Sequence, residues 1–182
     1  MTNPQLFMIL LGCKPLGRHT EQHDIFFGIA ENLKELIPAM RAFWPEAKGK
    51  IHIDAYRIVK QVEGFDVRVI AKQQANVEKP HQLFFLNLGG YQTDVFEELH
   101  YKMLLVDSEK EEAVKRAKKS PFFKQHITPH IDDKYGVDVD DIFNIEEVLP
   151  TAMKEKYQLS FTPTKNVTED ELMLGYIPIT KL

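Results

Sequence analysis

The heptapeptide LFMILLG, Leu6–Gly12, recurs 77 residues later as LFFLNLG, Leu83–Gly89. At the same offset Glu21 matches Glu98 and His23 matches His100. At an offset one residue longer, the tripeptide His-Ile-Asp at 52–54 matches the same tripeptide at 130–132. Several matched segments that occur in the same order at nearly the same offset indicate an internal repeat. We therefore predict a tandem duplication, with copy one at 1–72, a join at 73–81, copy two at 82–162 and a tail at 163–182 that packs on the body.

Each copy is predicted to contain the same elements in the same order. The apolar runs Leu6–Leu11 and Leu83–Leu88 predict strands that are covered on both faces and end at glycine. The other predicted elements are second strands at 21–30 and 98–106, and a helical pattern at 33–44 in which Pro38 predicts a kink or two short helices. In copy two a helix is predicted to start at a Ser108/Glu111 capping box. A His-Ile-Asp strand and a hairpin follow, with a Glu63-Gly64 turn in copy one and the strands Ile142–Val148 and Tyr157–Phe161 in copy two.

The repeated unit is therefore β-β-α-β-β. Each half is only about 70 residues long, a size at which a separate core is marginal. We expect the halves to share one core around an approximate two-fold axis, like a fused dimer. The predicted fold is a single α+β domain of mostly antiparallel sheet with one helix per repeat.

Composition excludes several classes of protein. The net charge is −4 and the sequence pI is about 6.0, so no excess of positive charge favours nucleic acid or an anionic membrane. The longest apolar run is shorter than the roughly 20 residues that a membrane-spanning helix needs. A single cysteine excludes an internal disulfide and fits a reducing compartment. We expect a cytoplasmic protein without a nucleic-acid or membrane partner.

Four phrases resemble a known family. They are GRHTEQHDIFFGI at 17–29, HIDAY at 52–56, NLGGY at 87–91 and HIDDKYGVDVDDI at 130–142. Together they resemble the bacterial proteins of domain-of-unknown-function family 1543, in which the domain occurs in one or two copies. The resemblance implies a duplication and a bacterial source. It implies no activity, no cofactor and no site residues.

The repeat also duplicates two polar pairs. Each copy has a Glu-x-His pair and a His-x-Asp pair, and residues two apart on a strand project from the same face. The candidate ligand-binding residues are Glu21, His23, His52, Asp54, Glu98, His100, His130 and Asp132; the two histidines and the aspartate of each copy are also candidate metal ligands. If the strands are neighbours, two imidazoles and two carboxylates converge. Such a set suits a divalent transition metal, or acid–base chemistry on a small molecule.

A structural interpretation competes with this one. His23 continues the face of Ile25 and Phe27, so it could be a histidine at the edge of the core that is locked by Asp54. In that case the pairs only stabilise the duplicated fold of a non-catalytic interaction module. No recognised catalytic motif is present, so we do not predict an enzyme, and no cofactor is identified.

A loop in copy one offers one further candidate. Lys14, Arg18 and His19 have no counterparts in copy two, so Arg18 is included as a candidate for a pocket specialised to copy one. The sequence leaves a homo-oligomer open.

Overall fold

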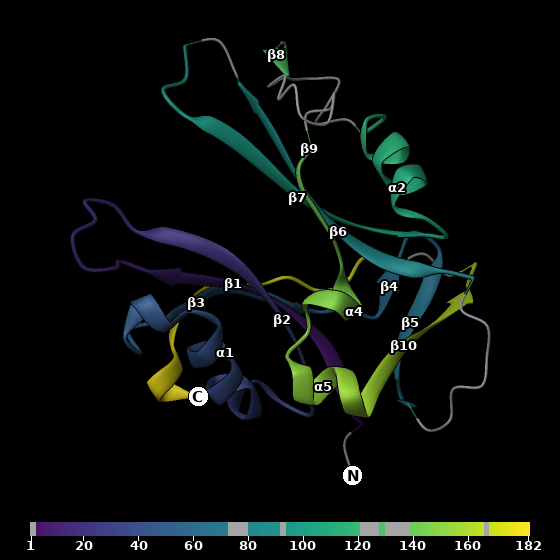
Figure 1. The fold of residues 1–182 in the computed structure, drawn as a ribbon, viewed down its shortest axis with the longest axis horizontal. Coiled ribbons are helices and arrows are strands. Elements are labelled where there is room, and N and C mark those ends of the chain that lie inside the picture. Colours follow the sequence, from purple (N-terminus) through teal and green to yellow (C-terminus); the bar gives the residue numbers. More distant parts are fainter. Residues whose placement is uncertain (1–2, 73–79, 92–93, 121–127, 130–138, 166–167) are drawn as a thin grey trace. The chain divides into compact units, whose positions relative to one another are not determined.

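The computed structural model describes residues 3–72, 80–91, 94–120, 128–129, 139–165 and 168–182. The chain divides into two compact units (Figure 1). Unit 1 is Met1–Asn76 with Leu149–Leu182, and unit 2 is Val77–Val148. The class is α+β with antiparallel strand pairs, as the sequence predicts.

Unit 1 contains a four-stranded antiparallel sheet in the order β11-β3-β1-β2. Its strands are β1 (Gln5–Cys13), β2 (Gln22–Ala30), β3 (His52–Ile58) and β11 (Met173–Pro178). The central strand β1 is the predicted apolar run. A 3-10 turn, η4 (Ile179–Lys181), follows β11.

The predicted first helix is two short helices, as expected from Pro38. They are η1 (Leu33–Leu36) and α1 (Ile37–Phe43), with Pro38 in the first turn of α1, where its missing N–H costs nothing. The backbone N–H of Glu35 donates to Asn32 Oδ1 at 3.3 Å, and Asn32 Nδ2 donates to Glu35 Oε1 at 2.9 Å. This reciprocal cap fixes where the helical segment begins. A further 3-10 turn, η2 (Pro45–Ala47), leads to β3.

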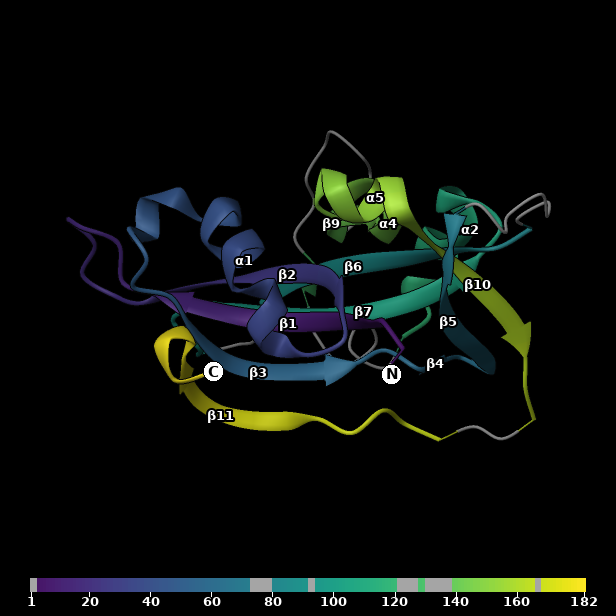
Figure 2. The ribbon, with the colours of Figure 1, turned by 90° about the horizontal axis from the view of Figure 1, so that it is seen from below.

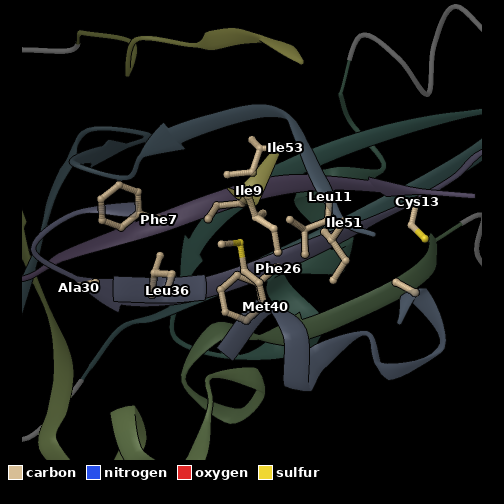
Figure 3. Close-up of a cluster of buried hydrophobic side chains, with 12 residues drawn as sticks. Phe7, Ile9, Leu11, Cys13, Phe26, Ala30, Leu36, Met40, Ile51 and Ile53 are labelled. Carbon is tan, nitrogen blue, oxygen red and sulfur yellow. The ribbon is translucent and has the colours of Figure 1, made fainter. Parts of the chain in front are cut away.

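The core of unit 1 lies between one face of this sheet and the helical segment (Figure 3). Phe7, Ile9 and Leu11 alternate along β1 toward the helices, because successive residues of a strand face opposite sides. Leu36 and Met40 pack onto them from the helical side. Gly12 therefore belongs to the opposite face of β1, away from this core.

A second sheet in unit 1 has the order β10-β5-β4. Its strands are β4 (Gln61–Val62), β5 (Phe65–Ala71) and β10 (Tyr157–Pro163); the helix α5 (Thr151–Lys156) precedes β10. Glu63 and Gly64 both have positive φ, 47° and 82°, which is the backbone of a two-residue hairpin turn. The predicted Glu63-Gly64 turn is thus confirmed.

Unit 2 is built on β6 (Gln82–Tyr91), which pairs with each of the other strands described in the unit. Those strands are β7 (Glu98–Asp107), β8 (Thr128–Pro129) and β9 (Val139–Asn144). Among the residues described in this unit, the helices are α2 (Lys110–Ala117) and α4 (Ile145–Val148). In α2, Ala113 and Ala117 are fully buried against β6 and β7 side chains such as Leu86 and Leu105.

Three local predictions are wrong. Gly12 and Gly89 do not end strands, because β1 continues to Cys13 and β6 to Tyr91. The predicted capping box is not formed: the N-cap of α2 is Glu109, and Ser108 instead donates its N–H to Asp107 Oδ1 at 2.8 Å.

The third error concerns the hairpin of copy two. The predicted strand Ile142–Val148 changes to helix after Asn144, whose Oδ1 accepts the N–H of Glu146 at 3.0 Å and so starts α4. β10 does form, but it pairs with β5, with Tyr157 opposite Ala71 and Pro163 opposite Phe65. The apolar side of β10 is therefore buried in unit 1.

One register relation recurs in the two units. Gly12 faces His23 across β1 and β2, and Gly89 faces His100 across β6 and β7. The register also shifts between Leu10 and Leu11, and between Asn87 and Leu88. Both features recur at the predicted offset of 77 residues. The tandem duplication, its common core and its domain boundaries remain predictions.

Asp170 holds the loop before β11 in place through hydrogen bonds to the backbone of unit 1. Its carboxylate accepts the N–H groups of Lys60, at 3.1 Å, and Gln61, at 3.2 Å. Asp170→Ala should lower the free energy of unfolding by about 1–2 kcal/mol, because it removes hydrogen bonds from two N–H groups to a charged carboxylate. Urea denaturation measures the loss, with the exposed neighbour Glu171→Ala as the control; equal effects of the two substitutions would contradict this role.

Within the described segments, no helix is long and apolar enough to cross a membrane.

Candidate functional site

Three strands of unit 1 bring the four copy-one candidates together. His23 lies on β2, His52 begins β3, and Gly12 on β1 faces both of them in the strand register. Directly opposed residues in antiparallel strands project from the same face, so both imidazoles stand over Gly12. Glu21 immediately precedes β2, and Asp54 follows on β3.

The side chains meet through the Nε2 atoms of the two histidines. His52 Nε2 lies 3.0 Å from Glu21 Oε1 and 3.3 Å from Asp54 Oδ1. His23 Nε2 lies 3.2 Å from Asp54 Oδ2 and 3.9 Å from Glu21 Oε2. Each imidazole is therefore flanked by both carboxylates. We call these four residues the His–carboxylate cluster.

A β-bulge places Asp54 in the cluster. Leu10 pairs with Ala55 and Leu11 pairs with Ile53, so Asp54 is the extra residue of β3. A bulge of this kind bends the strand and changes the direction of a side chain. Asp54 thereby reaches both histidines.

Gly12 leaves the space that the cluster fills. A Cβ atom at this position would collide with Nε2 and Cε1 of His52 and with Oδ2 of Asp54. Its φ is not in the left-handed region, so the need for glycine here is steric. The predicted strand end at this glycine did not indicate its steric role.

The cluster has a buried side and an exposed side. His52 is only 5% exposed, whereas the side chains of His23 and Glu21 are 43% and 44% exposed. His52, and not His23, is thus the buried histidine. Although their neighbours lie within ion-pair distance, neither His52 Nε2 nor Asp54 Oδ2 has a hydrogen bond of acceptable geometry to any described group. Buried polar atoms of this kind are rare and require an explanation.

Tyr176 on β11 covers the ring of His52. The two ring centroids are 4.3 Å apart with an interplanar angle of 37°. Pro178 of β11 lies opposite His52 in the strand register. No sequence signal identified Tyr176, since its position depends on a strand pairing between residues far apart in the chain.

Cys13 lies next to Gly12 but belongs to the core face of β1. Burial raises the pKa of its thiol, the negative charge of Glu21 raises it further, and Lys50 acts in the opposite direction. A thiol with a raised pKa is a poor nucleophile at neutral pH. Cys13 is therefore a core residue.

The copy-two candidates are only partly described. His100 Nε2 lies 3.8 Å from Glu98 Oε2 on β7 in unit 2. His130 and Asp132 lie outside the described residues. Arg18 is exposed on the β1–β2 loop and makes no ion pair with the cluster.

No three His, Cys, Asp or Glu side chains among the described residues could hold a metal ion as they stand. A hollow of about 390 Å³ lies elsewhere in unit 1, lined by residues of 3–6, 58–61 and 66–69. None of the predicted site residues lines it.

Comparisons with known proteins support the resemblance without adding an activity. Residues 18–69 match the family model "Domain of Unknown Function (DUF1543)". All four residues of the His–carboxylate cluster lie within this segment. Two tandem copies and a bacterial source remain predictions. The search of curated proteins finds no relative.

A solved structure shares the fold. The crystal structure of a protein Il1583 from Idiomarina loihiensis is similar with a TM-score of 0.65, covering 97% of this chain and 99% of that chain. The sequence identity is 19%, so the likeness concerns the fold alone.

Proposed function

We propose that the His–carboxylate cluster binds a divalent transition-metal ion. The observation that carries the proposal is the pair of buried atoms, His52 Nε2 and Asp54 Oδ2, that have no hydrogen bond although nitrogen and oxygen atoms surround them. An ion bound between the side chains would satisfy both atoms at once.

The distances within the cluster support this proposal. Ligand atoms bound to one ion at about 2.0–2.1 Å stand roughly 2.9–3.4 Å from one another. Three of the four N–O separations, 3.0, 3.2 and 3.3 Å, fall in that range. These three pairs therefore have the spacing of atoms that share an ion, although the four side chains do not yet converge on one point.

The fourth separation, 3.9 Å between His23 and Glu21, is too long. Both side chains are nearly half exposed and can rotate, whereas His52 is held by its burial and by Tyr176. We infer that the buried half of the cluster is preformed and that Glu21 and His23 close on the ion. This accounts for a cluster whose side chains do not converge as they stand.

The donor types select the class of ion. Imidazole nitrogen suits Zn²⁺, Ni²⁺, Cu²⁺ or Fe²⁺, whereas Ca²⁺ and Mg²⁺ prefer oxygen ligands. The carboxylates of Glu21 and Asp54 supply two negative charges that offset a divalent cation. We therefore expect Zn²⁺ and Ni²⁺ to bind, and Mg²⁺ to bind far more weakly.

Isothermal titration of the metal-free protein with Zn²⁺ tests the proposal. His52→Ala and Asp54→Ala should each weaken binding by at least about 100-fold, since loss of even an outer-shell partner can cost roughly 10–100-fold. His19→Ala is the matched control, because it removes an exposed histidine of the adjacent loop. Wild-type binding that His52→Ala leaves unchanged would reject the site.

A structural role for the cluster is the second candidate. Its contacts join the end of the β1–β2 loop, β2 and β3 through His–carboxylate pairs. In that case His52→Ala destabilises the protein, and zinc does not shift the unfolding temperature of the wild type. A metal site predicts the opposite for zinc, with a gain of about 2.7 kcal/mol at 100 times Kd.

A further inference from the structure

The C-terminal strand β11 forms an open edge of the unit 1 sheet. The strand order β11-β3-β1-β2 places β11 at the end, and it pairs only with β3 among the described strands (Figure 2). Its outer backbone N–H and C=O groups can therefore pair with a further strand.

This edge carries large apolar side chains in solvent. Leu174 is 77% exposed and Tyr176 is 68% exposed, and Leu172 and Met173 beside them are also exposed. Single exposed apolar residues are ordinary, but four within five residues at the edge of a sheet are not.

One common protection of an edge strand, a charged side chain, is missing here. Native edges carry a lysine or another charge at the exposed strand, and this prevents pairing with other chains. Residues 172–179, LMLGYIPI, contain no charged side chain, and their only proline, at 178, is the last residue of β11. The stretch 172–177 is thus uncharged and open to strand addition on both sides of the register irregularity between Leu174 and Ile177.

The flanks of this stretch have opposite charges. Glu169 and Glu171 precede it, and Lys181 follows it. In an antiparallel pair of two copies, the segment before the strand in one copy lies beside the segment after the strand in the other. The glutamates of each copy would then lie beside Lys181 of the other, an electrostatically favourable arrangement.

We propose that β11 is a homodimerisation edge, at which a second copy of this chain adds its own β11 in antiparallel orientation. Such a pair has two-fold symmetry, so each copy offers the same patch to the other. It buries the apolar side chains at 172–176 against their equivalents and joins the two sheets across the edge. This proposal is independent of metal binding.

Sedimentation velocity over protein concentrations from roughly 1 µM to roughly 1 mM tests the proposal. The wild type should change from monomer to dimer within this range, and Leu174→Lys should remain a monomer throughout. Leu16→Lys is the matched control, because Leu16 is an equally exposed leucine on the β1–β2 loop, and it should dimerise like the wild type. A wild type that stays monomeric, or dimers that persist in Leu174→Lys, would overturn the proposal.

Cross-linking tests the antiparallel orientation. In Leu174→Cys the new thiols of the two copies lie near the symmetry axis, so mild oxidation should give a disulfide-linked dimer. The native Cys13 is fully buried and should not interfere. Leu16→Cys should not cross-link. If Leu174→Cys and Leu16→Cys cross-link to the same small extent, β11 is not the interface.

Discussion

Replacing Phe26 by alanine should lower the free energy of unfolding by about 3–5 kcal/mol, because it removes a fully buried ring from the core of unit 1. Phe26 on β2 is 2% exposed and lies opposite Ile9 of β1. Its ring meets that of Phe43 edge to face, with centroids 5.5 Å apart and an interplanar angle of 67°. Two strands and a helix would all lose contacts.

The core cannot readily close this cavity. Leu36 and Met40 approach from the helical segment, which the Asn32–Glu35 cap holds at its start. For a chain of this size we expect the unfolding temperature to fall by roughly 6–20 °C. Differential scanning calorimetry measures the change.

Phe96 provides the matched control for this substitution. It is a phenylalanine of unit 2 with an exposed fraction of 108%, so it has no packing to lose. Phe96→Ala should change the stability by no more than about 0.5 kcal/mol. If Phe26→Ala is equally mild, the packing described for unit 1 is wrong.

The strands of this fold could be predicted because their signal is local. β1 and β6 are apolar runs that the sequence shows directly, and β2, β7 and the Glu63-Gly64 turn follow from alternation and turn chemistry. The two short helices around Pro38 could be predicted for the same reason. These features depend on neighbouring residues, which a single sequence contains.

Pairings between distant segments could not be predicted. The partner of β10 is β5, and the partner of β11 is β3. Both pairings depend on tertiary packing between segments far apart in the chain, which local sequence patterns do not show. The change from strand to helix after Asn144 depends on one hydrogen bond, to the N–H of Glu146.

The candidate site could be predicted only in part. Spacing two apart on a strand predicted that Glu21 could act with His23, and His52 with Asp54. It could not show that a bulge aims Asp54 at both histidines, or that Tyr176 covers His52. The sequence pattern also gives no reason why the residue of β1 that lies between His23 and His52 should be a glycine.

Gly12→Ala should destabilise the protein by about 1–3 kcal/mol and weaken zinc binding, because the added methyl group displaces His52 and Asp54. The backbone at Gly12 is not in the left-handed region, so alanine causes no backbone strain there. Without the collision, the same change would stabilise the protein by about 0.4–1 kcal/mol through the entropy of the unfolded chain. The sign of the effect therefore reports the collision.

A double-mutant cycle with His52→Ala isolates the cause of this effect. Truncating His52 removes two of the three atoms nearest to the added methyl group and leaves the contact with Asp54. The cost of Gly12→Ala should then fall by at least half in the His52→Ala background, as expected for residues in direct contact. Equal costs in both backgrounds, measured by urea denaturation, would show that Gly12 acts on something other than the histidine. Coupled costs, together with the loss of zinc binding, would link the smallest residue of β1 to the geometry of the cluster above it.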